Sequence, residues 1–262
     1  MFFDFHFHGG KKLIMEAERL GYSGVAVVKY LDDYDKDFLN HIQELKEEFG
    51  GEQLDEASSE KGSSKHFHDS GHLHGNENSR NHSFRIYSGV EITAKNPEAL
   101  KRKVQKFRKS ADVVIVQGGD LKINRAACED PRIDVLSQPY KNRRDSGMNQ
   151  VLAKKAAENS VAVELNLKYL LRTNPKNRYR VLNQFRQIVK LQRKFNFPLL
   201  TTCAAGSIYD LRTPQDVTAL SRCFGLTKEE AIETLSKTPM EIIKRGELRS
   251  SVIVNGVRTI TT

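Results

Sequence analysis

The chain has 262 residues, long enough for one large α/β domain or two small ones, and its 42 Lys and Arg against 33 Asp and Glu give a formal net charge of +9. It has no apolar run near the roughly 20 residues that span a bilayer, and it does not begin with the basic-then-apolar pattern of a signal peptide. Its three cysteines have no CxxC spacing, which argues against a disulfide framework and a cysteine zinc site. We therefore expect a cytoplasmic protein with no membrane partner.

The positive charge is concentrated in the middle of the chain. Residues 84–194 hold 25 basic and 10 acidic side chains, whereas residues 1–50 hold 6 basic and 10 acidic ones. No Asp or Glu occurs between Lys168 and Phe197. Such asymmetry is typical of a protein with an anionic partner, most often a nucleic acid, although a need for solubility alone is the alternative.

Short apolar runs alternate with helical patterns along the chain. They are rich in β-branched and aromatic residues, as expected for strands of a parallel sheet buried on both faces. The runs are Phe2–Phe7, Val25–Lys29, Arg85–Val90, Val113–Val116, Ile133–Leu136, Val161–Leu165 and Leu199–Thr202. About seven parallel strands with surrounding helices favour an α/β fold of the TIM-like (β/α) barrel type, and an open doubly wound sheet is the alternative.

Capping signals predict where several helices begin. A capping side chain before proline, or a Thr followed three residues later by Glu, marks the first turn of a helix. The signals are Asn96-Pro97, Asn174-Pro175, Thr213-Pro214 with Asp216, Thr238-Pro239 with Glu241, and Thr227 with Glu230.

Residues 50–83 interrupt the alternation of apolar runs and helical patterns. They are rich in Gly, Ser, Asn, Glu and His, so we expect a disordered insertion after the second helix of a single barrel domain formed by residues 1–246. The insertion contains His66, His68, His72, His74 and His82. These histidines either bind a transition metal or belong to an incidental polar loop, which we favour because nothing fixes their geometry. The tail, residues 247–262, is either a late strand or hairpin or a frayed extension.

The first predicted strand carries a candidate metal site. Its two-residue period places Asp4, His6 and His8 on one face, toward the barrel lumen, and the intervening phenylalanines on the other face, under the helices. Two imidazoles on one face at a strand end suit a metal ion. Glu91 ends the third strand, at the mouth where barrel active sites lie, and completes the predicted ligand set.

These motifs, Asp4-x-His6-x-His8 and Gly89-Val90-Glu91, resemble the polymerase-and-histidinol-phosphatase (PHP) family. The resemblance implies a distorted (β/α) barrel and a metal-dependent phosphoesterase with further histidine ligands on later strands. Here no histidine follows His82, and Thr201-Thr202-Cys203-Ala204-Ala205-Gly206 stands where the family places an Asp-x-His pair. We therefore expect at most one residual metal and no independent active site; an active phosphoesterase using Asp4, His6, His8 and Glu91 is the alternative.

A second resemblance covers most of the chain outside the insertion and the tail. Its motifs, in order, are Gly118-Gly119-Asp120, Asn124-Arg125-Ala126, Arg132-x-Asp134-Val135-Leu136, Gly147-Met148-Asn149, Val163-Glu164-Leu165-Asn166, Arg178-x-Arg180, and Tyr209-Asp210-Leu211-Arg212-Thr213-Pro214. Together with the depleted PHP-like site, they resemble the ribonuclease P protein component 3 family of archaea.

That resemblance implies a subunit of a ribonucleoprotein endonuclease that removes 5′ leaders from precursor tRNA. The catalytic RNA would hold the active-site Mg²⁺, and the chain would require no cofactor of its own. Its partners would be the ribonuclease P RNA, the protein component 2 and other subunits, and indirectly the precursor tRNA. A barrel that binds only proteins is a further alternative.

The basic residues supply the candidate RNA contacts. The helix predicted from residue 175 to 195 has an apolar face and an opposite Lys/Arg face, and such faces bind phosphate backbones. We expect RNA contacts from Lys101, Arg102, Lys103, Lys122, Arg125, Arg143, Arg144, Lys168, Arg178, Arg180, Arg186 and Arg212. A merely solvated face is the alternative for each of them.

Three loop residues have a second interpretation. Arg125 and Arg212 either contact RNA or form structural ion pairs with Asp134 or Asp210. Tyr140, beside several basic residues, either stacks on a base or is an ordinary loop tyrosine.

Overall fold

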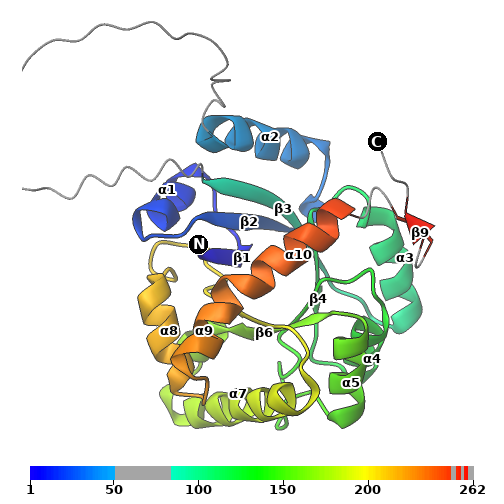
Figure 1. The fold of residues 1–262 in the computed structure, drawn as a ribbon, viewed down its shortest axis with the longest axis vertical. Helices are drawn as coiled ribbons and strands as arrows, with labels where there is room; N and C mark the ends of the chain where they lie inside the picture. Colours follow the sequence, from blue (N-terminus) through cyan, green and yellow to red (C-terminus); the bar gives the residue numbers. More distant parts are fainter. Residues whose placement is uncertain (51–83, 249–251, 255–256, 259–262) are drawn as a thin grey trace, which may run out of the picture.

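The computed structural model describes residues 1–50, 84–248, 252–254 and 257–258 (Figure 1). The predicted insertion, apart from Gly50, and its five histidines lie outside the described residues.

Seven parallel strands form one sheet in sequential order (Figure 1). They are β1 (Phe3–Phe7), β2 (Gly24–Tyr30), β3 (Arg85–Ile92), β4 (Val113–Gln117), β5 (Val135–Ser137), β6 (Ala162–Asn166) and β7 (Leu199–Thr202). All seven predicted strands are confirmed. The two edge strands approach each other, since the His8 amide donates to the Ala205 carbonyl (2.7 Å) and the Cys203 amide to the Asp4 carboxylate (2.9 Å). The sheet is therefore a nearly closed barrel, as predicted, rather than an open doubly wound sheet.

Helices surround the barrel and connect its strands. They are α1 (Lys11–Arg19), α2 (Lys36–Gly50), α3 (Pro97–Phe107), α4 (Leu121–Glu129), α5 (Gln150–Glu158), α6 (Leu167–Arg172), α7 (Pro175–Phe195), α8 (Pro214–Arg222), α9 (Lys228–Leu235) and α10 (Lys237–Glu247), with a short 3₁₀ turn at Leu31–Asp33. Among the described residues, none of these helices combines the length and the apolar character needed to cross a membrane.

Most of the predicted helix starts are confirmed. Asn96, Asn174 and Thr213 each accept a backbone N–H in the first turn of α3, α7 and α8, and Thr227 and Glu230 form a capping box at α9. The start predicted at Thr238-Pro239 is wrong. Only Ser236 separates α9 from α10, so α10 begins at Lys237 and Thr238 lies inside its first turn.

Two apolar layers hold the fold together. One lies between the sheet and the outer helices, and the other fills the barrel from within. The inner layer contains Phe3, Phe5, Ala26, Val28, Val113, Ile115, Val135, Ala162 and Leu200. Ile242 and Ile243 pack into it from α10, which crosses one end of the barrel and contacts β1, β4 and β7 (Figure 1). The C-terminal helix thus closes the barrel floor.

The predicted faces of the first strand are partly wrong. Phe7 does lie under the helices, but Phe3 and Phe5 belong to the inner layer. The pairing of β1 with β2 shifts between Asp4 and Phe7, and such an irregularity interrupts the two-residue alternation of a strand. Phe3 and Phe5 therefore point inward below the shift, and His6 and His8 point inward above it.

The tail contains a short hairpin. Strand β8 (Val252–Val254) pairs with β9 (Val257–Arg258) in antiparallel orientation. Of the two alternatives for the tail, the hairpin is confirmed.

The environments of the cysteines predict their reactivity. Cys128 and Cys203 are buried, and burial raises the pKa of Cys128 to about 12 and that of Cys203 further, whereas Cys223 is exposed. Because the thiolate is the reactive form, a thiol–disulfide reagent at pH 8 should modify one cysteine rapidly in the native chain and three in denaturant. Cys223→Ser should abolish the rapid phase. Rapid modification of all three native cysteines would contradict the described core.

Candidate functional site

A polar pocket opens at the carboxyl ends of the strands, where barrel active sites lie. Its volume is about 370 Å³. It is lined by His6, His8, Tyr30, Glu91, Gln117, Gln138, Lys141, Asn166, Lys168, Tyr169, Arg172, Thr173 and Ala204. We call it the mouth pocket.

Three of the four predicted metal ligands meet at the base of the mouth pocket. His6 Nε2 lies 3.5 Å and His8 Nε2 lies 3.8 Å from Glu91 Oε2, and one ligand atom from each residue lies within 4.8 Å of the others. Strands β1 and β3 supply these side chains. Among the described residues, this is the only group of three or more His, Cys, Asp or Glu side chains with metal-site spacing.

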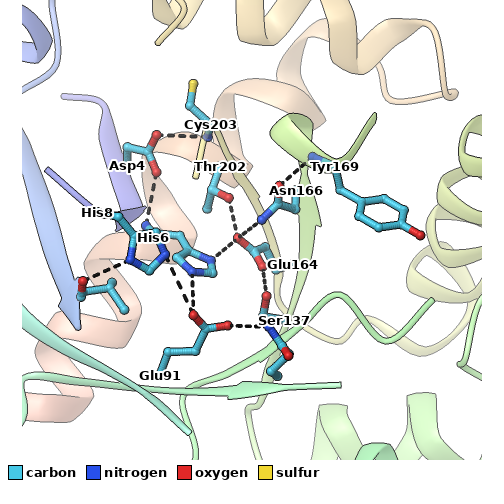
Figure 2. Close-up of polar contacts among 12 residues, drawn as sticks. Asp4, His6, His8, Glu91, Ser137, Glu164, Asn166, Tyr169, Thr202 and Cys203 are labelled. Carbon is cyan, nitrogen blue, oxygen red and sulfur yellow. Dashed lines mark hydrogen bonds and ion pairs between the residues drawn. The ribbon is translucent and has the colours of Figure 1, made fainter. Parts of the chain in front are cut away.

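The fourth predicted ligand, Asp4, is placed elsewhere. Its carboxylate accepts the backbone N–H groups of His6 (3.1 Å) and Cys203 (2.9 Å), so it links β1 to β7 across the seam of the barrel (Figure 2). Burial raises the pKa of Asp4 to about 6 despite these two hydrogen bonds. Asp4 is therefore not in the group that faces the mouth pocket, because the shift in β1 turns it away.

Glu164 is a central residue of the site, although its motif, Val163-Glu164-Leu165-Asn166, did not predict a site role for it. Its carboxylate is fully buried and accepts a 2.7 Å hydrogen bond from His6 Nδ1, and it also accepts the hydroxyls of Ser137 and Thr202 (Figure 2). The signal was a charged residue within an otherwise apolar strand, Val163-Glu164-Leu165. Glu164 holds the His6 ring in place from the side opposite Glu91.

The two histidines have opposite electrostatic environments. Burial opposes a charge on His6, but the carboxylates of Glu164 and Glu91 outweigh it and raise the pKa of His6 well above its ordinary value. Burial and the neighbouring His6 lower the pKa of His8 to about 4. The two carboxylates therefore favour a positive charge beside them, whereas the surroundings of His8 favour its neutral form.

Some predicted RNA contacts lie at the mouth, and others do not. Of the predicted contacts, Lys168 lines the pocket and pairs with Asp210 at 3.4 Å, and the neighbouring Arg172 also pairs with Asp210 at 2.6 Å. Lys122 and Arg125 follow β4 in sequence but lie on α4, where they border a groove shared with Lys101 of α3. That groove has a volume of about 680 Å³ and shares no lining residue with the mouth pocket.

The structure separates the predicted basic residues into two groups. Eight bind groups of the same chain: Lys103 binds the Thr93 carbonyl, Arg125 Glu129, Arg143 Asp145, Lys168 Asp210, Arg178 the Leu171 carbonyl, Arg180 the Tyr179 hydroxyl, Arg186 the Cys223 carbonyl, and Arg212 the Tyr209 and Leu211 carbonyls. The other four, Lys101, Arg102, Lys122 and Arg144, are exposed and make no ion pair within the described part of the chain. All twelve RNA contacts stay predictions.

Arg125 and Arg212 do not form the structural ion pairs that were the alternative for them, because Asp134 and Asp210 pair with other basic residues. Asp134 binds Arg108 and Arg245, and Asp210 binds Lys168 and Arg172. Arg108 lies in a basic run of the sequence but is not a surface cation, because its guanidinium is mostly buried against Asp134.

Tyr140 does not stack on a base in this fold. Its ring is fully buried against Tyr169 and Phe185, and its hydroxyl accepts the backbone N–H of Asn166. Gln184, a polar residue on the buried face of α7, donates to the carbonyls of Arg143 and Asp145. The long loop after β5 is thus fixed by buried side chains.

Asn124 has a similar scaffolding role. Its amide donates to the carbonyls of Pro139 and Gly147 and accepts the Gly119 N–H, each at 3.0 Å. Gly147 has φ of +66°, and a Cβ there would overlap the Pro139 carbonyl, so only glycine fits. The loops that follow β4 and β5 are therefore joined.

Comparisons with known proteins agree with this architecture. The family model described as RNase P subunit p30 matches residues 1–251. The chain is 44% identical over 264 aligned residues to ribonuclease P protein component 3 of Methanothermobacter thermautotrophicus, covering 99% of this chain and 95% of that protein. It is 40% identical to the protein of that name from Methanosarcina mazei, over 68% of this chain and 74% of the relative.

A solved structure of a ribonuclease P also resembles this chain. The chain superposes with a TM-score of 0.77 on a chain from a cryo-EM structure of archaeal ribonuclease P with mature tRNA. The two are 28% identical, and the match covers 99% of this chain and 98% of the other. By sequence and by fold, the chain belongs to the RNase P subunit p30 family.

Proposed function

We propose that this chain works as a protein subunit of ribonuclease P, the ribonucleoprotein endonuclease that removes 5′ leaders from precursor tRNA. It binds and stabilises the catalytic RNA, and that RNA holds the Mg²⁺ ions that carry out cleavage. The chain requires no cofactor for this role. The family match and the structural likeness to a subunit of an archaeal ribonuclease P support the proposal.

The observation that carries RNA binding is the exposed face of α7. Lys176, Arg180, Lys190 and Lys194 are exposed, and their spacing places them along one stripe of the helix. No acidic residue occurs on α7, and none of these four forms an ion pair within the described residues. Uncompensated cations on a rigid outer helix suit the phosphate backbone of a structured RNA, which proteins recognise largely by shape.

The cluster at the barrel mouth supports an accessory role. A hydrolytic site with two or three metals needs more ligands than His6, His8 and Glu91 provide. The later strands contribute Thr201, Thr202 and Glu164 instead of histidines. We therefore propose that the chain does not cleave RNA by itself.

The proposal also includes binding to other protein subunits. We propose that the chain pairs with ribonuclease P protein component 2, as the family resemblance implies. Ile208 and Tyr209, in the loop before α8, are 56% and 80% exposed and are candidates for a protein contact. The cytoplasmic location expected from the sequence stays a prediction.

Omission from a reconstituted enzyme tests this function. Ribonuclease P assembled from its RNA and its protein subunits should cleave the 5′ leader of precursor tRNA more slowly at limiting Mg²⁺ when this chain is left out. Adding the chain back should restore the rate, and the chain alone should not cleave. Equal rates with and without the chain, or cleavage by the chain alone, would contradict the proposal.

A further inference from the structure

We propose that the mouth pocket binds one divalent transition-metal ion through His6 Nε2, His8 Nε2 and Glu91 Oε2. This metal site is separate from the proposed RNA-binding surface, and we do not propose that the ion takes part in RNA cleavage. The ligand class is a borderline-soft cation such as Zn²⁺, Co²⁺ or Mn²⁺, since imidazole nitrogens suit these ions better than Mg²⁺.

The distances among the three atoms fit a metal better than direct hydrogen bonds. Ligand atoms about 2.1 Å from a tetrahedral Zn²⁺ lie about 3.4 Å from one another. Glu91 Oε2 lies 3.5 Å from His6 Nε2 and 3.8 Å from His8 Nε2, both beyond a good N–H···O distance. All three ligand atoms lie within 4.8 Å of one another, so side-chain rotations that close this gap would bring them to bonding distance of one ion.

Each proposed ligand is oriented by a contact at its other polar atom. His6 Nδ1 is 2.7 Å from the Glu164 carboxylate, and His8 Nδ1 is 3.1 Å from the Val28 carbonyl. Gln117 donates to Glu91 Oε1 (3.2 Å), which leaves Oε2 toward the two rings. Histidine ligands in metal sites nearly always have such a partner, since it fixes the tautomer and the ring orientation.

Neighbouring side chains cover part of the ligand group, and the mouth pocket leaves room beside it. The Tyr30 ring stacks on His8 at 5.3 Å, and Glu164 backs His6, whereas the mouth pocket opens above the three ligand atoms. A bound ion would therefore keep at least one position for water or an anionic group entering past Lys168. Glu91 and Glu164 bring two negative charges to a buried place, and a divalent cation would replace the proton on His6 Nε2 as the positive charge that balances them.

The experiment uses the full chain with His66, His68, His72, His74 and His82 replaced by Ala, because those histidines could bind the probe elsewhere. Co²⁺ is titrated while its visible ligand-field absorption is recorded, and Zn²⁺ binding is measured by calorimetry. We expect one equivalent of each ion. His8→Asn keeps a donor for the Val28 carbonyl but removes the second ring nitrogen, and Glu91→Gln removes the charge; each should weaken binding at least about tenfold.

Matched controls separate the site from general effects. His41 and Glu98 are exposed on α2 and α3, so His41→Asn and Glu98→Gln should leave the affinity unchanged. Melting without metal should be the same for His8→Asn and its parent, which shows that the fold is intact. Absence of saturable binding in the parent, or equal binding by the parent, His8→Asn and Glu91→Gln, would overturn the proposal.

Discussion

Replacing Asp134 with alanine is expected to lower the free energy of unfolding by about 3–5 kcal/mol, because it leaves two arginines without their shared carboxylate. Asp134 is fully buried and lies 2.7 Å from Arg108 and 2.7 Å from Arg245. It also accepts the backbone N–H of Val114 at 2.8 Å. One carboxylate thus joins α10 and the residue after α3 to the barrel wall. Urea unfolding of the variant measures the loss.

Two further variants make the result specific. Asp134→Asn keeps an oxygen acceptor and should cost less than Asp134→Ala, whereas Asp32→Ala, at an exposed position, should change stability by no more than about 0.5 kcal/mol. A double-mutant cycle of Asp134→Ala with Arg245→Met should show coupling, since both changes affect one ion pair. Equal stability of Asp134→Ala and Asp32→Ala would contradict this account of the barrel floor.

Replacing three lysines of α7 with glutamine should weaken RNA binding at least about tenfold, and at about 0.1 M salt by up to about 500-fold. The variant is Lys176→Gln, Lys190→Gln and Lys194→Gln. All three side chains are exposed and make no ion pair within the described residues, so the substitution should leave stability nearly unchanged. Binding to ribonuclease P RNA by filter retention or fluorescence measures the effect.

The matched control removes the same number of lysines from the acidic N-terminal part. Lys12, Lys29 and Lys36 are exposed there, and their replacement by glutamine should change RNA affinity by much less. If both triple variants lose the same affinity, net charge rather than the α7 surface determines binding.

The strand order and most helix starts were predictable because they depend on local properties. Seven short runs of β-branched and aromatic residues became the seven strands, and Asn96, Asn174 and Thr213 cap helices through hydrogen bonds within three residues. The error at Thr238 has a different origin. Ser236 ends α9 and begins α10, so the packing of two successive helices outweighs the local capping signal.

The details of the site depend on long-range contacts and could not be predicted from the sequence. A shift in the β1–β2 pairing moved Phe3 and Phe5 inward and turned Asp4 toward β7, although strict alternation predicts the opposite. Glu164 is 158 residues away from His6 in sequence, and their contact exists only in the folded barrel.

The surroundings of the basic residues also depend on long-range contacts and could not be predicted from the sequence. Arg108 and Lys109 are neighbours in one basic run, but the former is held by Asp134 and the latter is exposed. Tyr140 follows a strand among polar residues, yet Phe185 of α7 covers its ring. Charge along a sequence thus indicates an anionic partner but does not select the side chains that reach it.

The slope of RNA affinity against salt concentration tests the central claim most directly. The logarithm of the association constant of the wild-type chain for ribonuclease P RNA should fall linearly with the logarithm of the salt concentration. The slope for the α7 triple variant should be less steep by about 2 to 3, because each lost phosphate contact reduces the slope by about 0.7 to 0.9. The Lys12, Lys29 and Lys36 variant should keep the wild-type slope. A flat wild-type dependence, or parallel lines for the wild type and the α7 variant, would contradict binding of RNA phosphates by this surface.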